Sequence, residues 1–263
     1  MSILSPIIDL VWHICRAKAF DSNSLLCKVL KNIGVGKFVF RIRVLQFRIE
    51  NLLGHFNQRF IEYPWVLQQL GSGKNRILLD VGCSGSLLDH ELIARGFHVV
   101  GLDIQDHPMR NSREVFIQAN VINTNLPSET FDVILLVSTI EHVGLDTYGQ
   151  VILADDADFW AMQELRRLLK KDGVLLLTTP YEGGGPLKIH RWRRNGCEFL
   201  ERRYDHERLT KLLAGFLTVK SAFFLCLLKN KCKFVPIEKR ILDKLSAKAC
   251  EGSLACLILR KNI

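Results

Sequence analysis

Short apolar runs alternate with segments of helical periodicity along the chain from about Lys74 onward. The apolar runs are continuous, which is typical of strands that are buried on both faces of a sheet. They predict strands at 76–81, 98–103, 115–118, 131–138 and 174–178, with two later strands around 217–228 and 254–260. Helical spacing predicts helices at 87–95, 158–171 and 205–214. This alternation predicts an α/β fold with a doubly wound, mostly parallel sheet.

Residues 1–70 have a different pattern, with helical periodicity and few strand signals. We interpret them as an N-terminal helical cap that ends in "QRFIEYPWVLQQL", followed by a second domain at 71–263. In doubly wound sheets ligands bind outside the carboxyl ends of the strands, so a cap over that edge would form part of a substrate pocket. The alternative is that the cap only covers an edge of the sheet, and the sequence favours neither interpretation.

The composition is that of a globular protein, because 48% of the residues are hydrophobic and 24% are charged. The net charge of +9 is uneven: residues 1–70 hold nine Lys or Arg against four acidic residues, and a second basic cluster lies at 190–203. Such clusters suit an anionic partner, which can be nucleic acid, a phosphorylated substrate or an acidic membrane surface. A solvated basic face is the alternative.

Eight cysteines are present, but no two have the CxxC spacing, so the pattern predicts neither a zinc site nor a redox dithiol. The first residues, "MSILSPIIDLVWHIC", lack a basic leader, and Asp9 and His13 interrupt an apolar stretch that is too short to span a bilayer. These features predict a cytoplasmic location with reduced thiols.

The segment "ILLDVGCSGSLLDHELIARG" at 77–96 has a strand, a turn of small residues and a helix. A serine hydrolase elbow fits poorly, because Ser86 occupies the last glycine position and no Gly-rich loop precedes the segment. The dinucleotide fingerprint GxGxxG fits poorly too, since its second and third glycines are replaced by Ser84 and Leu87. Asp80 would also face a pyrophosphate at the mouth of the strand, where like charges repel.

A carboxylate at this position suits a cation, and S-adenosylmethionine (SAM) carries a sulfonium and an ammonium but no phosphate. A SAM site needs small residues for close backbone approach, a nearby acid, and a second acid after the next strand for the ribose hydroxyls. The sequence has Asp80 and then Asp103, in "VVGLDI". The segments "LLDVGCSGSLL", "VVGLDI", "FDVILLVSTIEHVG" and "LKKDGVLLLTTP" together resemble the successive motifs of class I SAM-dependent methyltransferases.

The resemblance covers about Arg76–Pro180, and "STIEHVG" further resembles a poorly characterised microbial branch of these enzymes. It implies a Rossmann-like sheet of seven strands and SAM as the methyl donor. By position, it implies that the donor is bound by Asp80, Gly82 and Ser84 at the methionine end, by Asp103 and Ile104 at the ribose and adenine, by Asn120 and Val121 at the adenine, and by Ser138 after the fourth strand. Ser84 and Asn120 depart from the usual Gly and Asp of the family.

The same resemblance places Glu141 and His142 beside the transferred methyl group. His142 titrates near neutrality and is our candidate for a general base. Two alternatives stay open: the imidazole bonds a backbone carbonyl in a structural role, or the pair binds a divalent metal with help from His190 or His206.

We therefore expect a SAM-dependent methyltransferase that acts on a small or glycan/lipid-linked anionic acceptor, with O-methylation favoured. Tyr181, Glu182 and "GGG" at 183–185 predict a mobile lid, and the arginines of the basic cluster (Arg191, Arg193, Arg194, Arg202, Arg203) favour the anionic acceptor. An RNA methyltransferase is the first alternative, although no RNA-binding module is visible. A SAM-binding regulatory protein without transferase activity is the second. The basic N-terminal segment allows peripheral membrane contact, and the sequence does not predict an oligomeric state.

Overall fold

The computed structural model describes residues 58–107, 110–148, 154–183, 188–194, 197–227, 233–246 and 248–262. Contacts divide the chain into a unit of residues 1–55 and a compact unit that begins at Phe56. Only the second unit contains described residues. Most of the predicted N-terminal cap, residues 1–57, therefore lies outside them.

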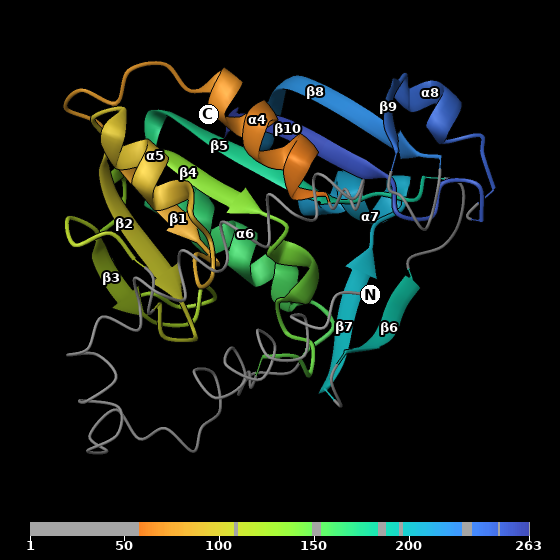
Figure 1. The fold of residues 1–263 in the computed structure, drawn as a ribbon, viewed down its shortest axis with the longest axis horizontal. Helices are drawn as coiled ribbons and strands as arrows, with labels where there is room; N and C mark the ends of the chain where they lie inside the picture. Colours follow the sequence, from red (N-terminus) through yellow and green to blue (C-terminus); the bar gives the residue numbers. More distant parts are fainter. Residues whose placement is uncertain are drawn as a thin grey trace, which may run out of the picture. The chain divides into compact units, whose positions relative to one another are not determined.

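The main sheet of the described residues has eight strands in the order β3-β2-β1-β4-β5-β10-β8-β9 (Figure 1). These strands are β1 (Ile77–Val81), β2 (His98–Asp103), β3 (Val115–Gln118), β4 (Phe131–Val137), β5 (Leu169–Pro180), β8 (Phe216–Cys226), β9 (Phe234–Ile237) and β10 (Leu254–Lys261). The first five pair in parallel, whereas β10 is antiparallel to both β5 and β8, and β9 is antiparallel to β8. The predicted Rossmann-like α/β fold is confirmed, with one strand more than the predicted seven.

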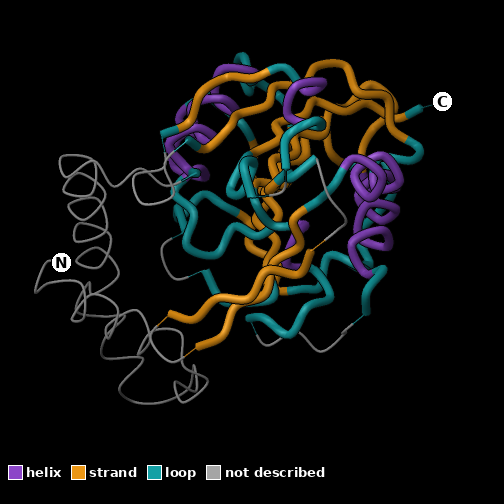
Figure 2. Tube along the Cα trace, turned by 90° about the vertical axis from the view of Figure 1, so that its right-hand side faces the viewer, coloured by secondary structure: helices purple, strands orange, loops and turns teal. Residues whose placement is uncertain are grey.

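The helices are α4 (Arg59–Gln69), α5 (Leu88–Ala94), α6 (Ala157–Leu168), α7 (His206–Leu212) and α8 (Lys239–Leu242), with a 3₁₀ turn, η1, at Ile140–His142. Figure 2 shows helices on both sides of the strands. No helix of the described segments is long and apolar enough to cross a membrane.

Two hydrophobic clusters explain why the strands are apolar on both faces. Successive side chains of a strand point to opposite faces, so Leu79 packs with α6 and α7 in one cluster while Leu78 packs with α4 and α5 in the other. Along β4, Ile134 joins the first cluster and Val133 the second. Both clusters are sealed by helices, which makes the sheet a rigid support for its carboxyl edge.

Several boundaries differ from the sequence prediction. Helix α6 ends at Leu168, and β5 begins at once with Leu169, although 169–171 had been assigned to the helix. The predicted helix at 205–214 is present as α7; Asp205 caps it by accepting from the Arg208 N–H, and the chain turns at Gly215 with a φ of +85°. The basic cluster is a hairpin of β6 (Lys188–Arg194) and β7 (Cys197–Arg203), which forms a separate two-stranded sheet.

Candidate active site

The carboxyl ends of β1, β2, β4 and β5 lie at one edge of the sheet because these strands are parallel. The loop after β1 turns sharply at Gly82, whose φ is +77°. A Cβ at this position would overlap the Thr139 side chain, so only glycine fits. The Gly82 N–H donates to the Leu102 carbonyl at 2.8 Å, which ties the loop to the end of β2.

Asp103, the last residue of β2, orients this loop. Its Oδ2 accepts from the Ser84 N–H and its Oδ1 from the Gln105 N–H, each at 2.8 Å. The Ser84 hydroxyl donates to the Asp106 carbonyl at 2.9 Å, so the serine that replaces the usual glycine adds a contact. These two contacts fix the Asp103 carboxylate beside the loop.

Asp80, near the end of β1, is buried and its Oδ2 has no hydrogen-bond partner among the described residues. Burial raises the pKa of Asp80 to about 8; the charges of Asp89 and Asp103 add to this, and that of Arg59 opposes it. A buried acceptor without a donor is costly in a folded protein. This oxygen is suited to accept from a cationic N–H group, which the ammonium of SAM would provide.

The residues predicted to border the adenine make contacts within this chain. The Asn120 Oδ1 accepts from the Ile122 N–H at 3.0 Å, so the amide oxygen expected to face adenine closes a turn in its own chain. Val121 is buried in the core, and the Ile104 carbonyl accepts from the Gln118 side chain at 3.0 Å. These three residues follow the ends of β2 and β3, next to the Asp103 edge.

Glu62, on α4, belongs to this edge and was missed in the sequence. It is buried; its Oε1 accepts from the hydroxyls of Ser138 and Thr178, and its Oε2 from Arg59 at 2.8 Å. Ser138, predicted to bind the cofactor, has a φ of +43° and uses its hydroxyl in this contact. One signal was available: Glu62 lies three and four positions before Trp65 and Val66, on the apolar face of its helix.

His142 follows β4 in η1, as the motif predicts. Its Nδ1 lies 2.7 Å from the Leu200 carbonyl on β7. Because a carbonyl oxygen only accepts, Nδ1 carries the proton and the lone pair of the neutral ring is on Nε2. Burial lowers the pKa of His142, which keeps the ring neutral at pH 7. A neutral imidazole with this tautomer can accept a proton.

Glu141, the acid next to His142 in the sequence, is not the group that the imidazole Nδ1 contacts. It is buried and contacts the hydroxyl of Thr179, which donates to its Oε2 at 3.3 Å. Burial raises the pKa of Glu141 to about 8, and the nearby Glu62 adds to this. The Leu200 carbonyl takes the orienting position instead. Thr147 supports it, because its Oγ1 accepts from the Leu200 N–H at 2.9 Å.

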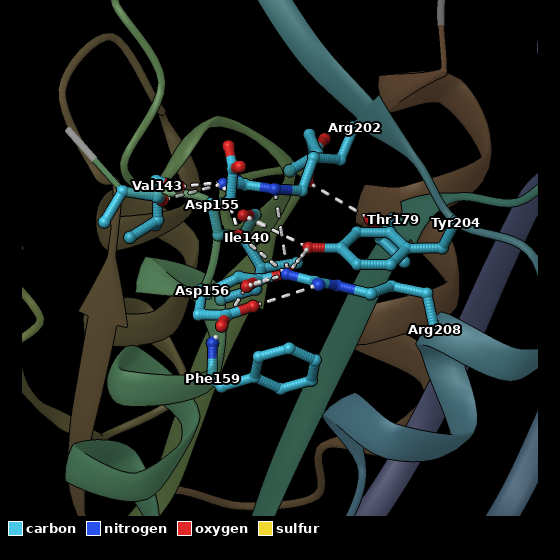
Figure 3. Close-up of polar contacts among 12 residues, drawn as sticks. Ile140, Val143, Asp155, Asp156, Phe159, Thr179, Arg202, Tyr204 and Arg208 are labelled. Carbon is cyan, nitrogen blue, oxygen red and sulfur yellow. Dashed lines mark hydrogen bonds and ion pairs between the residues drawn. The ribbon is translucent and has the colours of Figure 1, made fainter. Parts of the chain in front are cut away.

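Two of the five arginines predicted to bind an anionic acceptor have structural contacts instead. Arg202 is 1% exposed; it donates to the carbonyls of Val143, Ala154 and Asp155 and lies 3.8 Å from Asp158 (Figure 3). Arg203 forms ion pairs with Glu182 at 2.7 Å and with Glu201 at 3.0 Å. The expectation that these two side chains face an acceptor is wrong, because both are compensated by acids and carbonyls of this chain.

The same close-up shows contacts between the segment after β7 and helix α6 (Figure 3). Asp158, at the start of α6, is buried; it accepts from the Tyr204 hydroxyl at 3.0 Å and pairs with Arg208 at 2.6 Å (Figure 3). The Arg208 guanidinium also stacks on the Phe159 ring at 4.0 Å. This network holds the segment after β7 against α6, and thereby positions Leu200 beside His142.

The metal alternative for Glu141 and His142 finds no partner in the described segments. His190 contacts Glu201 and Arg203, and His206 contacts Lys239. The one group of three possible metal ligands among the described residues lies elsewhere, at Cys83, His107 and Glu114.

Comparisons with known proteins agree with this geometry. Residues 79–177 match a family described as a methyltransferase domain. A ubiquinone biosynthesis O-methyltransferase of Pelagibacter ubique is 29% identical over 147 residues, which are 53% of this chain and 52% of that protein. One from Mesorhizobium japonicum is 28% identical over 152 residues, 52% of this chain and 57% of the relative. The chain thus spans about half the length of the curated relatives it matches.

Among solved structures, the 1,6-didemethyltoxoflavin-N1-methyltransferase of Burkholderia thailandensis, with S-adenosylhomocysteine bound, superposes with a TM-score of 0.53. The match covers 89% of this chain and 90% of that one at 15% identity. A SAM-dependent methyltransferase from Methanosarcina mazei has the same TM-score over 75% of this chain and 97% of its own, also at 15% identity. At such identities these structures establish the shared fold.

Proposed function

We propose that this chain, whose residues 79–177 are a class I SAM-dependent methyltransferase domain, transfers a methyl group to a hydroxyl of a small or glycan/lipid-linked anionic acceptor. The observation that carries the proposal is the buried Asp80 Oδ2 without a donor, beside Asp103 at the carboxyl edge of the sheet. We keep the microbial branch suggested by "STIEHVG" as part of the proposal, on the strength of that motif alone.

Asp80 would accept from the ammonium of SAM, and Asp103 would accept from the ribose hydroxyls. Gly82 and Ser84 would allow the backbone to approach the methionine end, Ile104, Asn120 and Val121 would border the adenine, and Ser138 would line the pocket from β4. When bound, SAM supplies an electrophilic methyl group on a sulfonium. The residues of this chain then have to align the acceptor and remove its proton.

His142 is the proposed base. Its neutral ring would take the acceptor hydroxyl proton at Nε2, while the Leu200 carbonyl stabilises the imidazolium through Nδ1–H. Glu141, with its raised pKa, would remain protonated at pH 7 and line the site rather than ionise. The structural alternative for His142 remains, because the same Leu200 bond also joins β7 to η1.

O-methylation is favoured by the names of the curated relatives, which are O-methyltransferases of ubiquinone biosynthesis. The net charge of +9 favours an anionic acceptor. The basic N-terminal segment would take part in acceptor binding or in contact with an anionic membrane surface, and residues 1–57 lie outside the described residues. Cys83 and Cys256 are buried thiols outside any disulfide, which favours the cytoplasm.

The test is a binding and turnover experiment on the full chain. Calorimetry should give saturable SAM binding, and radiolabelled SAM should label one class in a panel of phenols, hydroxy acids, lipid-linked glycans and RNA. Label on an acidic small molecule or lipid-linked glycan, stable to the mild base that cleaves methyl esters, supports the proposal. Label on RNA alone supports the nucleic-acid alternative. Tight SAM binding without transfer to any acceptor supports the regulatory one, and absence of SAM binding overturns all three.

A further inference from the structure

Three buried side chains with metal-binding atoms meet beside the loop after β1. Cys83 belongs to that loop, His107 follows β2, and Glu114 directly precedes β3. One ligand atom from each residue lies within 4.8 Å of the others. Cys83 and His107 are 0% exposed and Glu114 is 8% exposed. The sequence analysis missed this group because its members are spread over 32 positions without a CxxC pair.

The imidazole of His107 and the carboxyl of Glu114 have no hydrogen-bond partner in the described segments. Both ring nitrogens of His107 and both carboxyl oxygens of Glu114 are buried without a hydrogen bond. The His107 Nε2 and Glu114 Oε2 are 3.7 Å apart, which is too long for a hydrogen bond. Four such atoms in one place are an exception in folded proteins, because a desolvated polar group without a hydrogen bond is costly.

The backbone leaves room for these side chains. Gly101, in the middle of β2, lies between them: a Cβ there would overlap the Glu114 Oε1 and lie 2.9 Å from the Cys83 Sγ. Any larger residue at this position would therefore displace the carboxyl group. The space on this side of β2 is occupied by the thiol and the carboxyl of the group.

We propose that Cys83, His107 and Glu114 bind a divalent transition metal of the zinc class. A thiolate, an imidazole and a carboxylate are all ligands of Zn²⁺, and three protein ligands leave one tetrahedral position for water or for a fourth side chain. A thiolate and a carboxylate together balance the charge of a divalent ion.

Electrostatics make the metal-free group neutral. Burial raises the pKa of the Cys83 thiol, raises that of Glu114 to about 8 and lowers that of His107. Several charged groups act on the three residues: Asp80, Asp89, Asp103, Asp106, His90 and Arg110. Metal binding would displace the thiol proton, because the thiolate is the form of cysteine that binds a metal.

A metal here would join the loop that carries Ser84 to the loop that follows Asp103. These two loops already share the hydrogen bond from the Ser84 N–H to Asp103. The metal would thus stabilise the two loops that border the proposed SAM site. Only this consequence rests on the proposed methyltransferase function. Metal binding itself can be measured without SAM and without turnover, so the two proposals can fail separately.

The experiment uses the full chain, stripped of metal with a chelator and titrated with Zn²⁺ against a chromophoric competitor. We expect one equivalent to bind, and the midpoint of thermal unfolding to rise with Zn²⁺ concentration. Titration with Co²⁺ should give a thiolate-to-cobalt charge-transfer band in the near ultraviolet. Cys83→Ser should abolish the band, and Cys83→Ser and Glu114→Gln should each weaken binding by about 100-fold or more, since even indirect supports of metal ligands contribute 10- to 100-fold.

Cys256→Ser is the matched control, because Cys256 is another buried thiol outside the group. It should leave the metal affinity and the cobalt band unchanged. If Cys83→Ser fails to fold, the cobalt titration of the other two proteins is the test. A charge-transfer band in the unsubstituted chain that persists in Cys256→Ser supports the proposal, and absence of the band in the unsubstituted chain overturns it. A chain that binds no Zn²⁺ above the competitor, or a folded Cys83→Ser that binds as tightly as the original, overturns the proposal.

Discussion

Glu62 on α4 accepts a hydrogen bond at 2.7 Å from the hydroxyl of Thr178, which lies 116 positions later in β5. Both residues are buried. The same carboxylate pairs with Arg59, whose guanidinium also donates to the Val137 carbonyl at 3.1 Å. Helix α4 is therefore joined by polar contacts to the ends of β4 and β5, at the edge where the candidate site lies.

Replacing Glu62 with Ala should destabilise the protein by about 2 kcal/mol, because the buried Thr178 hydroxyl and the partly buried Ser138 hydroxyl lose their acceptor. Arg59 contributes less to the loss, since its side chain is 35% exposed and water can replace the carboxylate. Urea denaturation measures the change. Glu91→Ala is the control: its pair with Arg95 is exposed, and it should cost about 0.5 kcal/mol or less. Equal losses in the two variants would contradict a role for the buried contact.

Truncation separates α4 from the residues before it. A chain that begins at Phe56 should fold and bind SAM, because the compact unit starts there. A chain that begins at Gly71 loses Trp65 and Val66 from the core, at about 1.5–3 kcal/mol for each side chain, and should be much less stable. If residues 1–55 contribute to the acceptor pocket, the longer fragment should bind SAM normally but turn over acceptor slowly. Full turnover would contradict that role.

The pattern of apolar and polar residues predicted the parallel strands of the sheet well. Strands β2 and β3 have the predicted bounds, because continuous apolar runs between polar turns leave little ambiguity. The β6–β7 hairpin is visible in the sequence only as a basic cluster, because its charges are balanced between the two strands, as in the pair Arg191–Glu198 at 2.9 Å. A single strand does not reveal such pairing.

The candidate site also has a part that the sequence predicts and a part that only the tertiary structure shows. The order of Asp80, Asp103 and His142 along the chain follows from the strand ends, and a sequence motif records that order. Other contacts depend on tertiary structure, such as the Leu200 carbonyl on His142, 58 positions away. A backbone carbonyl has no sequence signature. The sequence therefore indicated which residues to consider for the site, but not what orients them.

Asp103→Ala should weaken SAM binding by about 30- to 1000-fold, because a carboxylate that the bound ribose would desolvate and hydrogen-bond is worth about 2–4 kcal/mol. Asp103 also accepts from the Ser84 and Gln105 amides, so circular dichroism must first show that the fold is intact. Calorimetry then gives the affinity. The exposed Asp106, replaced by Ala, is the nearby control and should change the affinity little. Unchanged affinity in Asp103→Ala would place the ribose contact elsewhere.

SAM binding should depend on pH through Asp80. The pKa of its buried carboxyl is about 8 in the protein without ligand, whereas an ammonium partner requires the ionised form. Binding therefore releases a proton below pH 8, and affinity should rise up to tenfold per pH unit before levelling off above that value. Calorimetry in buffers of different ionisation enthalpy counts the protons. Asp80→Asn should bind weakly and without proton release; proton release that persists in this variant would assign it to another group.

His142→Ala should lower turnover by about 10²- to 10⁴-fold with SAM affinity nearly unchanged, because a base acts on the acceptor and not on the donor. A base must be unprotonated, so the rate should rise with pH through the pKa of His142. Burial lowers that pKa below the ordinary value of about 6.5, and the rise should be complete by neutrality. The variant should lack this step. His206→Ala replaces a histidine that contacts Lys239 on the outer surface of α7, and it should keep both the rate and the step. Near-normal turnover in His142→Ala would leave the Leu200 bond as a purely structural contact, with alignment as the main source of catalysis.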